Sequence, residues 1–497
     1  MTAEPLSAIA ALLAHPLVAR VRALAEARRT AVLLVGGAVR DAILGREVHD
    51  FDFAVQGGAV RLARAVADAL EAHFYVLDAE RDIGRVLIPA RPGEPQVTLD
   101  FAACVGSSWA EDQRARDFTV NAIGVELSSG ALVDATGGLR DLREGMLRLT
   151  HPAAVRADPV RALRGVRLSH ALNLRLDEET AQQLSAARAW LMQPSAERLR
   201  DELFEMLKLP RASAAIRMLN DLGLLEVLLP EVRLLCEQPQ APHYAFNVLA
   251  HSLHALAALD EEGYALLHAD RETRTALEAP SAEARTWLSL LRFAALMHDC
   301  GKPEVAQQDG EGRWRFPGHA ERSAERAAQR ARALRLSAHE IAWLRTCIAH
   351  HTRLNEIAAA PALPSDRVVY RLLKDLGEVT PAAALLVVAD CWARRAETTS
   401  ENPCEAQCTF AQQLTRAYFQ RWLPLQANPP LVNGHDLLAL GVPHGPRIGE
   451  ILEAVREARF CGEVQTREEA LALARQLSAA ANAGMLRIAR QARRHWR

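Results

Sequence analysis

The stretch VGGAVRDAILGREVHDFDFAV, residues 35–55, decides the fold of the first part of the chain. It follows directly on a short apolar and β-branched run, AVLLV at 31–35, which predicts a strand that ends at two glycines. A helix is expected after the glycines, and DFDFAV at 50–55 begins with the alternation of a second strand. From residue 151 the periodicity is helical. The expected fold class is therefore α+β, with a sheet-containing head followed by an all-helical body.

The two glycines and the start of the following helix suit an anion site. Gly36 and Gly37 let the backbone approach a ligand closely, and the unpaired N–H groups of a helix N-terminus favour a negative group such as a triphosphate. Arg40 adds a guanidinium suited to bidentate contact with phosphate.

Three acidic residues on predicted strands form the candidate catalytic set. Asp50 and Asp52 are two positions apart, so both carboxylates lie on one face of their strand. Carboxylates so close repel each other. A pair of Mg²⁺ ions would relieve the repulsion, activate an attacking hydroxyl and neutralise departing pyrophosphate. Asp100, in the alternating run VTLDFA at 97–102, is the candidate third carboxylate, binding metal or accepting the hydroxyl proton.

At this point the sequence resembles the class II tRNA nucleotidyltransferase and poly(A) polymerase family, whose head opens with GGxVRDxxLG and a nearby DxD. The resemblance implies a nucleotidyltransferase-type mixed β-sheet, Mg²⁺ bound by Asp50 and Asp52, and the incoming nucleotide bound by Gly37 and Arg40. ARDFTVNAIG, residues 115–124, is similar to the family's RRDFTxNA segment, which handles the nucleotide and its ribose. Ala115 replaces the first arginine, and the matching residues are Arg116, Asp117 and Asn121.

A helix expected in DPVRALRGVRL, residues 158–168, carries candidate residues for reading the base. A proline stands near its start, and Asp158 is the expected N-cap. The segment resembles the family's EDxxR motif, with Ala157 in place of the glutamate. The resemblance implies that Asp158 and Arg161 imitate the edge of a partner base. Arg164 continues the same cationic ridge and is a third candidate contact to the nucleotide.

The helical body contains a second candidate metal site. His251 lies in AHSLHALAAL, His298-Asp299 end an apolar helix, and Asp390 lies in a third apolar helix. This pattern resembles the HD phosphohydrolase motif H…HD…D and implies a metal bound by the four residues. Imidazole with carboxylate suits a transition metal such as Ni²⁺ or Mn²⁺ better than Mg²⁺. Further ligands are expected at His319 and at His350 of the pair His350-His351.

Together the motifs imply an enzyme that adds CCA to the 3′ end of tRNA from CTP and ATP, without a nucleic-acid template and with release of pyrophosphate. Addition of only CC, addition of only A, and poly(A) synthesis are alternatives. Only 16 residues separate Asp100 from Asp117, and a shortened loop there is associated in the family with CC-only addition. An HD phosphohydrolase with a relic head is disfavoured, because a relic has no reason to retain both Asp50 and Asp52.

Length and composition indicate several domains in a cytoplasmic protein. The 497 residues divide into a head at 1–150, a neck at 151–235, an HD region at 236–400 and a helical tRNA-binding region at 401–497. No apolar run approaches the roughly 20 residues that span a bilayer. Eight scattered cysteines are expected as free thiols. The net charge of −2 permits local contact with RNA and disfavours bulk nonspecific binding; it does not indicate an oligomeric state.

Overall fold

The computed structural model describes residues 3–89, 96–237, 247–260, 270–394 and 404–482. The chain forms two compact units. The first contains Met1–Leu209 and Ala214–Leu228, and the second contains Pro210–Ser213 and Leu229–Arg497. The division into four regions expected from the sequence stays a prediction.

The first unit is built on a seven-stranded mixed sheet with the order β3-β4-β5-β2-β1-β6-β7. Strands β2 and β5 run parallel, and the other neighbours are antiparallel. The strands expected near 31–35, 50–55 and 97–102 are confirmed as β1, β2 and β5. The strand bounds are β1 Val32–Val35, β2 Asp50–Val55, β3 His73–Asp78, β4 Ile83–Ile88, β5 Val97–Ala103, β6 Gly124–Glu126 and β7 Leu132–Val133.

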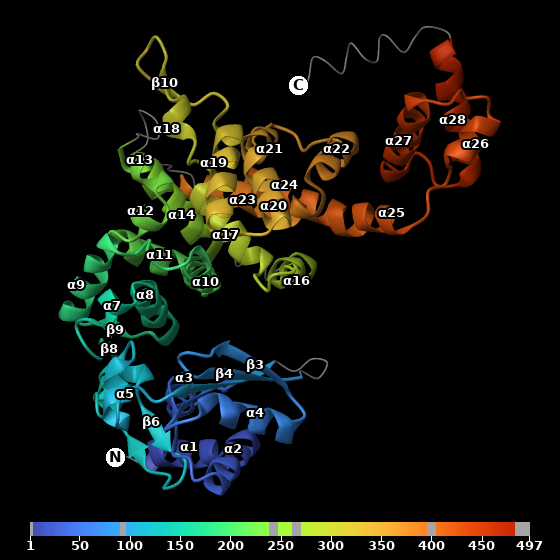
Figure 1. The fold of residues 1–497 in the computed structure, drawn as a ribbon. Coiled ribbons are helices and arrows are strands. Elements are labelled where there is room, and N and C mark those ends of the chain that lie inside the picture. The colour runs from blue at the N-terminus through green and yellow to red at the C-terminus, as the bar shows by residue number, and fades with distance from the viewer. Residues whose placement is uncertain (1–2, 90–95, 238–246, 261–269, 395–403, 483–497) are drawn as a thin grey trace. The chain divides into compact units, whose positions relative to one another are not determined.

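One face of this sheet forms the core of the head. Helices α1 (Ala3–Ala14), α2 (Pro16–Ala27) and α4 (Ala59–Leu70) lie on one side of the sheet (Figure 1). Phe53 and Phe101 point into this core and stack with ring centroids 4.9 Å apart. Because side chains alternate along a strand, the neighbouring acids Asp52 and Asp100 project from the opposite face.

Helices complete the first unit beyond the sheet. Parallel strands β8 (Met146–Leu147) and β9 (Arg175–Leu176) form a small sheet of their own beside these helices. The helices are α3 Gly37–Ile43, α5 Trp109–Ala115, α6 Gly138–Glu144, α7 Ala154–Ala157, α8 Val160–Leu172, α9 Glu178–Ala186, α10 Ala196–Leu207, α11 Ala212–Asp221 and α12 Leu225–Leu228.

The start of α8 corrects one expectation. Pro159 directly precedes the helix, and no side chain caps its first turn. Asp158 has an extended backbone, and its carboxylate accepts a hydrogen bond from Arg198 Nη2 at 2.6 Å. The prediction that Asp158 is the N-cap is therefore wrong, because α10 supplies a charged partner for that carboxylate.

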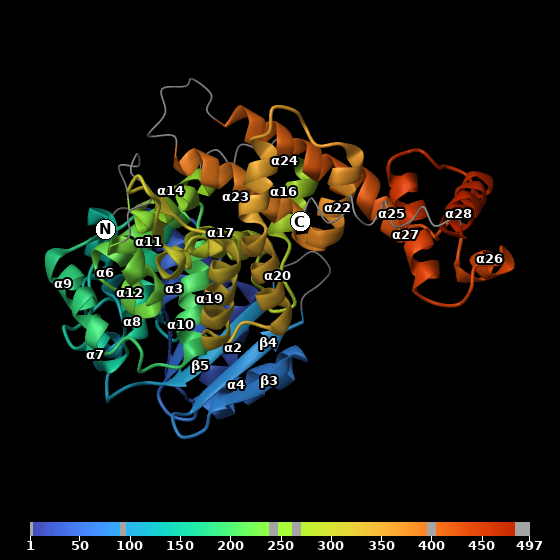
Figure 2. The same cartoon turned by 90° about the horizontal axis from the view of Figure 1, so that it is seen from above.

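In the described residues, the second unit is helical apart from an isolated bridge between Pro280 and Thr286 and the two-stranded pair β10 (Gln307–Gln308) and β11 (Trp314–Arg315). Its centre is formed by α14 (Val248–Asp260), α17 (Trp287–Met297), α19 (His319–Ala333), α20 (Ala338–Ala349) and α23 (Thr380–Ala393), which pack side by side (Figure 2). Helices α26 (Gly434–Ala439), α27 (Pro446–Phe460) and α28 (Arg467–Asn482) surround a small core of their own. The remaining helices are α13 Glu231–Glu237, α16 Arg271–Glu278, α18 Lys302–Val305, α21 His351–Ala358, α22 Asp366–Leu376, α24 Glu405–Ala417 and α25 Leu423–Ala427.

The cysteines differ from the expectation of free thiols at one place. Cys391 and Cys404 form a disulfide, with Cα atoms 5.9 Å apart. The sequence does not reveal this pair, because only the packing of α23 against the start of α24 brings the two residues together.

No single helix in the described ranges is both long and apolar enough to cross a membrane. The bent pair α1–α2 meets that measure only when both helices are counted together, across a bend of 72°. Both helices contribute buried residues to the core of the head.

Candidate active site and second metal centre

The sheet brings the predicted acidic residues of the head together. Asp52 of β2 lies directly opposite Asp100 of β5, and Asp50 is two positions before Asp52 at the exposed start of β2. All three carboxylates therefore project from the face that does not carry the core. Arg85 of β4 lies opposite Asp100 on the other side, and its Nε and Nη2 donate to the two carboxylate oxygens at 2.7 Å each.

Asp52 has the most perturbed environment of the three acids. Burial raises the pKa of Asp52 from 3.8 to about 6, Arg116 opposes this rise, and the charges of Asp100 and Asp50 add to it. Gly36 lies against the same carboxylate with φ +89°, and a Cβ added there would be 3.0 Å from Asp52 Oδ2. Glycine at this position therefore keeps space next to the carboxylate as well as adopting a left-handed backbone.

This donor set fits a divalent cation. Carboxylate oxygens are the ligands that Mg²⁺ prefers. Burial first, and then the neighbouring carboxylates, disfavour the ionised form of Asp52, which a cation would stabilise. Asp50 and Asp52 would hold the ion, with Asp100 beside them. A bound Mg²⁺ supplies Lewis-acid stabilisation of a developing negative charge.

The residues predicted to handle the nucleotide form a connected group. Arg40 is buried, and it donates to Asp41 through Nε at 2.9 Å and Nη2 at 2.7 Å and to the amide oxygen of Asn121 through Nη1. Asn121 in turn donates to Asp117 at 3.2 Å. Arg116 pairs with Asp112 at 2.9 Å. The hydrogen bonds of Arg40 thus connect α3 to the segment that contains Asn121. The role of Arg40 in phosphate binding stays a prediction.

The neck arginines extend this group. Arg164 Nη1 donates to Asp117 at 3.0 Å, and Arg164 Nε donates to Glu202 at 2.9 Å. Arg167 Nε donates to the other oxygen of Glu202 at 2.7 Å. Asp117 is buried, so it acts here as an anchor that connects the nucleotide segment of the head to α8.

The side chain of Arg161 contacts main-chain atoms of the head. Its guanidinium donates to the carbonyl oxygens of Ala115 and Arg116 at 3.1 and 3.2 Å. These bonds hold α8 against the segment that contains the nucleotide motif. That Asp158 and Arg161 read a base stays a prediction.

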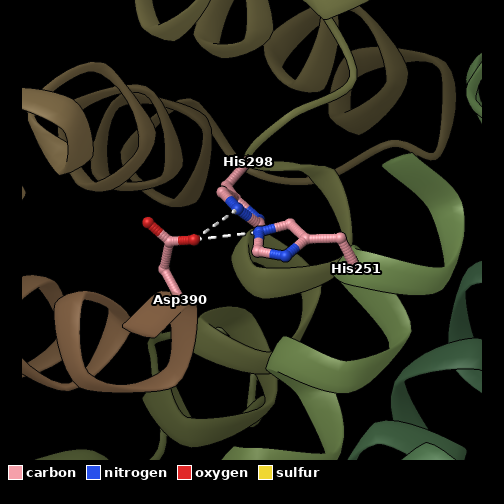
Figure 3. Close-up of side chains that lie close together, drawn as sticks. All are labelled: His251, His298 and Asp390. Atoms are coloured by element: carbon pink, nitrogen blue, oxygen red, sulfur yellow. Dashed lines mark hydrogen bonds and ion pairs between the residues drawn. The ribbon is translucent and has the colours of Figure 1, made fainter. Parts of the chain in front are cut away.

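The second unit assembles the predicted His-Asp cluster. His251 Nε2 lies 2.9 Å from Asp390 Oδ1, and His298 Nε2 lies 3.7 Å from the same oxygen (Figure 3). Asp299 Oδ2 is 3.3 Å from His298 and 3.6 Å from His251. The four residues come from α14, the end of α17 and α23, so the three-helix arrangement expected from the motif is present.

The other oxygen of Asp299 faces two further histidines. Asp299 Oδ1 is 3.4 Å from His319 Nε2 and 3.8 Å from His351 Nε2, and the two imidazole nitrogens are 3.3 Å apart. His319 thus lies beside Asp299, and its role as a metal ligand stays a prediction. The expectation for His350 is corrected: its neighbour His351, at the start of α21, occupies this place, whereas the charges near His350 are Asp375, Arg353 and Glu321.

The atoms of this cluster fit a metal ion. His298 Nε2 and Asp299 Oδ1 are buried and have no hydrogen-bond partner within the described residues. Burial lowers the pKa of His351 to about 3, which favours the neutral imidazole that metal binding requires. Burial also opposes protonation of His298, but the neighbouring Asp299 and Asp390 raise its pKa overall. Two overlapping groups could each hold an ion: His251, His298 and Asp390, and His298, Asp299 and His351.

A cavity of about 460 Å³ opens beside the cluster. Asp299, Asp390, His319 and His351 form part of its wall. Lys302, which donates to Asp299 Oδ2 at 2.6 Å, brings a positive charge to the same wall. Trp314 and Phe316, at the end of the β10–β11 pair, add aromatic surface. The cavity therefore combines metal ligands with groups that suit an anion.

Sequence reasoning missed two residues of the head and neck that the geometry places in these groups. Arg85 lies on β4, a strand that was not predicted, so nothing indicated its position opposite Asp100. Glu202 lies in SAERLRDELFEML, residues 195–207, a segment whose helix-spaced leucines indicate packing and not a polar contact. A buried acid on an otherwise apolar helix face was the signal that could have revealed it.

Three family models match the chain. They are the poly A polymerase head domain at 32–148, the probable RNA and SrmB-binding site of polymerase A at 173–235, and the HD domain at 265–395.

Curated relatives match over most of their length. An A-adding tRNA nucleotidyltransferase from Deinococcus radiodurans is 34% identical, over 88% of this chain and 94% of that protein. A CC-adding tRNA nucleotidyltransferase from Thermus thermophilus is 32% identical, over 88% and 92%. A multifunctional CCA protein from Xanthomonas campestris is 29% identical, over 86% and 97%.

Solved structures support the same fold. The Thermotoga maritima CCA-adding enzyme in complex with tRNA superposes with a TM-score of 0.61 at 22% identity, covering 94% of this chain and 97% of that one. The expected mixed-sheet head and helical body are thereby confirmed. With the head carboxylates, the three matched models and the relatives in view, the chain belongs to the tRNA nucleotidyltransferase family and is a nucleotidyltransferase that carries an HD domain.

Proposed function

We propose that this enzyme adds CCA to the 3′ end of tRNA, using CTP and ATP as substrates. The observation that carries the chemistry is the row of Asp52 and Asp100 on paired parallel strands, with Asp50 beside them. In this proposal Asp50 and Asp52 bind the Mg²⁺ that stabilises the charge on the departing pyrophosphate. Asp100 would be the third carboxylate, binding the metal or accepting the proton of the 3′-hydroxyl.

Substrate selection is assigned to the neck. Asp158 and Arg161 offer an acceptor and donors, the two features that a nucleobase edge requires. Arg164, held between Asp117 and Glu202, fixes the helix that carries them. The tRNA is proposed as substrate because two relatives are named tRNA nucleotidyltransferases, one A-adding and one CC-adding.

A second candidate, addition of CC without A, is favoured by the connection between β5 and α5. Residues 104–108 form this whole connection, and hydrogen bonds restrain it. Glu111 accepts from Ser107 N at 2.6 Å, and Asp112 accepts from Val105 N at 3.0 Å. The family resemblance associates a longer, mobile loop at this place with the change from adding C to adding A. In this chain the loop is short and is held by hydrogen bonds to Glu111 and Asp112.

One experiment separates these candidates. Purified full-length protein is incubated in Mg²⁺ with tRNA that lacks CCA and with tRNA that ends in CC, each with CTP, ATP or both, and the products are sequenced. Complete CCA ends support the first proposal. Products that stop at CC although ATP is present support the second. Long A tracts would indicate a poly(A) polymerase, and no extension of either RNA would refute both.

We further propose that the His-Asp cluster binds a transition metal, such as Ni²⁺ or Mn²⁺, and hydrolyses a phosphoester. Two buried atoms without a hydrogen-bond partner in the described residues, His298 Nε2 and Asp299 Oδ1, support the metal. The adjoining cavity, with Lys302 in its wall, supports an anionic substrate. Release of phosphate from a generic phosphomonoester or opening of a cyclic phosphodiester, dependent on added metal and lost on chelation, is the expected result.

A further inference from the structure

Arg85 occupies a position in the head that the proposed chemistry does not use. It lies on β4 directly opposite Asp100 of β5, and Asp100 lies directly opposite Asp52 of β2. Directly opposed residues project from the same face of a sheet. Arg85, Asp100 and Asp52 therefore form a row across three neighbouring strands.

The pair of Arg85 and Asp100 uses both carboxylate oxygens. Nε donates to Oδ1 and Nη2 donates to Oδ2, both at 2.7 Å, which is the two-armed geometry that only a guanidinium offers. The hydrogen bond to Asp100 raises the pKa of Arg85, and the charges of Asp100, Asp50 and Asp52 add to the rise. The guanidinium thus interacts with the whole carboxylate group while its hydrogen bonds are to Asp100.

A divalent cation bound at Asp100 would use a carboxylate oxygen that already accepts a hydrogen bond from Arg85. Mg²⁺ requires close, nearly octahedral contact with oxygen at about 2.0–2.1 Å. A cation that takes an oxygen of Asp100 shares that oxygen with one arm of the Arg85 pair, and the two positive charges repel each other. Arg85 and the cation compete for the same carboxylate.

We propose that Arg85 is a positioning residue that holds Asp100 in line with Asp52 and sets, through Asp100, the divalent-cation concentration at which the head becomes competent. This inference rests on the proposed function, and within it on Asp100 as a carboxylate that binds the metal. Loss of Arg85 has two opposing effects: Asp100 becomes available to the cation, and it loses a restraint. The first effect dominates, because the strand already fixes Asp100 opposite Asp52, whereas a charged bidentate pair is among the stronger hydrogen-bonded contacts.

The test compares Mn²⁺ binding to full-length Arg85→Gln and wild-type protein by calorimetric titration. Binding to the HD cluster is the same in both, and it is removed by subtracting the titration of the Asp50→Asn/Asp52→Asn variant. Arg85→Gln is expected to bind Mn²⁺ about tenfold more tightly, the size expected for one charged hydrogen-bonded arm. The Mg²⁺ concentration for half-maximal addition of C should fall by a similar factor.

A second background shows whether Arg85 acts through Asp100. In Asp100→Asn protein, Arg85 no longer has a negatively charged partner on β5. Its side chain is 40% exposed in the wild type, so water screens the positive charge of its guanidinium. Arg85→Gln should then change Mn²⁺ affinity by about twofold or less. Arg81→Gln is the matched control, because Arg81 pairs with Asp78 at 3.7 Å and not with the carboxylate row. It should leave both measurements unchanged.

The outcomes are distinct. Unchanged or weaker Mn²⁺ binding in Arg85→Gln overturns the inference, as does equal tightening in both backgrounds. If Asp100→Asn alone leaves Mn²⁺ binding intact, the proposed role of Asp100 fails first and the inference fails with it. Arg85→Lys keeps the charge and the stem but not the two-armed contact. It should tighten binding in the same direction, so the test does not depend on the folding of one variant.

Discussion

Asp52 combines a cost to folding with a proposed role in the chemistry. Its carboxylate is largely removed from water, next to Asp100 and near Asp50, with Arg116 as the opposing charge. In the folded protein without metal, this group therefore holds its proton more tightly than in the unfolded chain. A cation in the site would reverse that balance, because it stabilises the ionised form.

Asp52→Asn is expected to abolish nucleotide addition and to stabilise the metal-free protein at neutral pH. The pKa of Asp52 is raised from 3.8 to about 6 on folding, so its contribution to stability is complete below about pH 4 and is lost as the pH rises through about 6. A shift of this size corresponds to about 3 kcal/mol. Urea unfolding in EDTA should show wild type and variant equal at pH 4 and the variant more stable at pH 8.

Asp50→Asn is the control for this measurement. Asp50 lies at the exposed start of β2, so its replacement removes a proposed metal ligand without removing a buried carboxylate. Addition should be lost in both variants, whereas only Asp52→Asn should gain stability at pH 8. A stability difference that does not depend on pH would contradict the assigned environment of Asp52.

Arg161→Ala is expected to relax the choice among CTP, ATP, UTP and GTP. Each lost bidentate contact to a base is worth about 1–3 kcal/mol of discrimination. Competition among the four nucleotides on one tRNA measures this directly. Arg156→Ala is the control, because Arg156 is an exposed cation of the same region that lies over Trp190. If selectivity is retained and only stability falls, Arg161 serves the main-chain contacts to Ala115 and Arg116 alone.

At the scale of elements, the contact between α8 and α10 depends on one acid. Glu202 is buried and accepts from both Arg164 and Arg167, and Arg164 also reaches Asp117 in the head. Two arginines and two acids therefore hold the neck helices to each other and to the nucleotide segment. Asp158 and Arg161, the residues proposed to read the base, lie at the start of α8, so their placement depends on this contact.

Glu202→Gln is expected to lower the free energy of unfolding by about 2 kcal/mol, because both arginines lose a charged partner. The figure is below that of a fully buried pair, since Arg164 and Arg167 are partly exposed. Glu205→Gln, in the same helix, removes an exposed acid paired with Lys208 and should have little effect. Denaturant unfolding of the two variants measures the difference, and equal losses would contradict the role of Glu202.

The sequence predicted some elements and missed others for physical reasons. Strand β2 is predictable because its first residues, Asp50 to Phe53, alternate between a polar face and a core face. Strand β3, HFYVLD, is an edge strand with mostly exposed side chains, so it has no such alternation. The missed strand β4, IGRVLI, carries Arg85. The metal cluster was predictable from His298-Asp299, but the choice between His350 and His351 depends on where α20 ends and α21 begins.

At the scale of the whole molecule, the two proposed metal sites belong to different compact units. The carboxylate row lies in the unit that contains the seven-stranded sheet, and the His-Asp cluster lies among the helices of the second unit. The ligands also differ in kind, because the head offers oxygen alone and the second unit offers nitrogen and oxygen. The two sites should therefore select different metals.

Replacing both His298 and Asp299 with Ala is expected to remove the bound transition metal and any phosphoester hydrolysis, while nucleotide addition in Mg²⁺ stays within about twofold of wild type. The reason is that no residue of the carboxylate row belongs to the second unit. Elemental analysis and both activity assays measure the outcome.

His350→Ala is the matched control, because it removes a neighbouring histidine that has no ligand position in the cluster, and it should retain metal. Circular dichroism must show both variants folded, since the double substitution removes buried side chains. Equal metal content in the double variant and wild type would reduce the cluster to a structural feature. Loss of addition together with hydrolysis, in folded protein, would instead mean that the two units are coupled in catalysis.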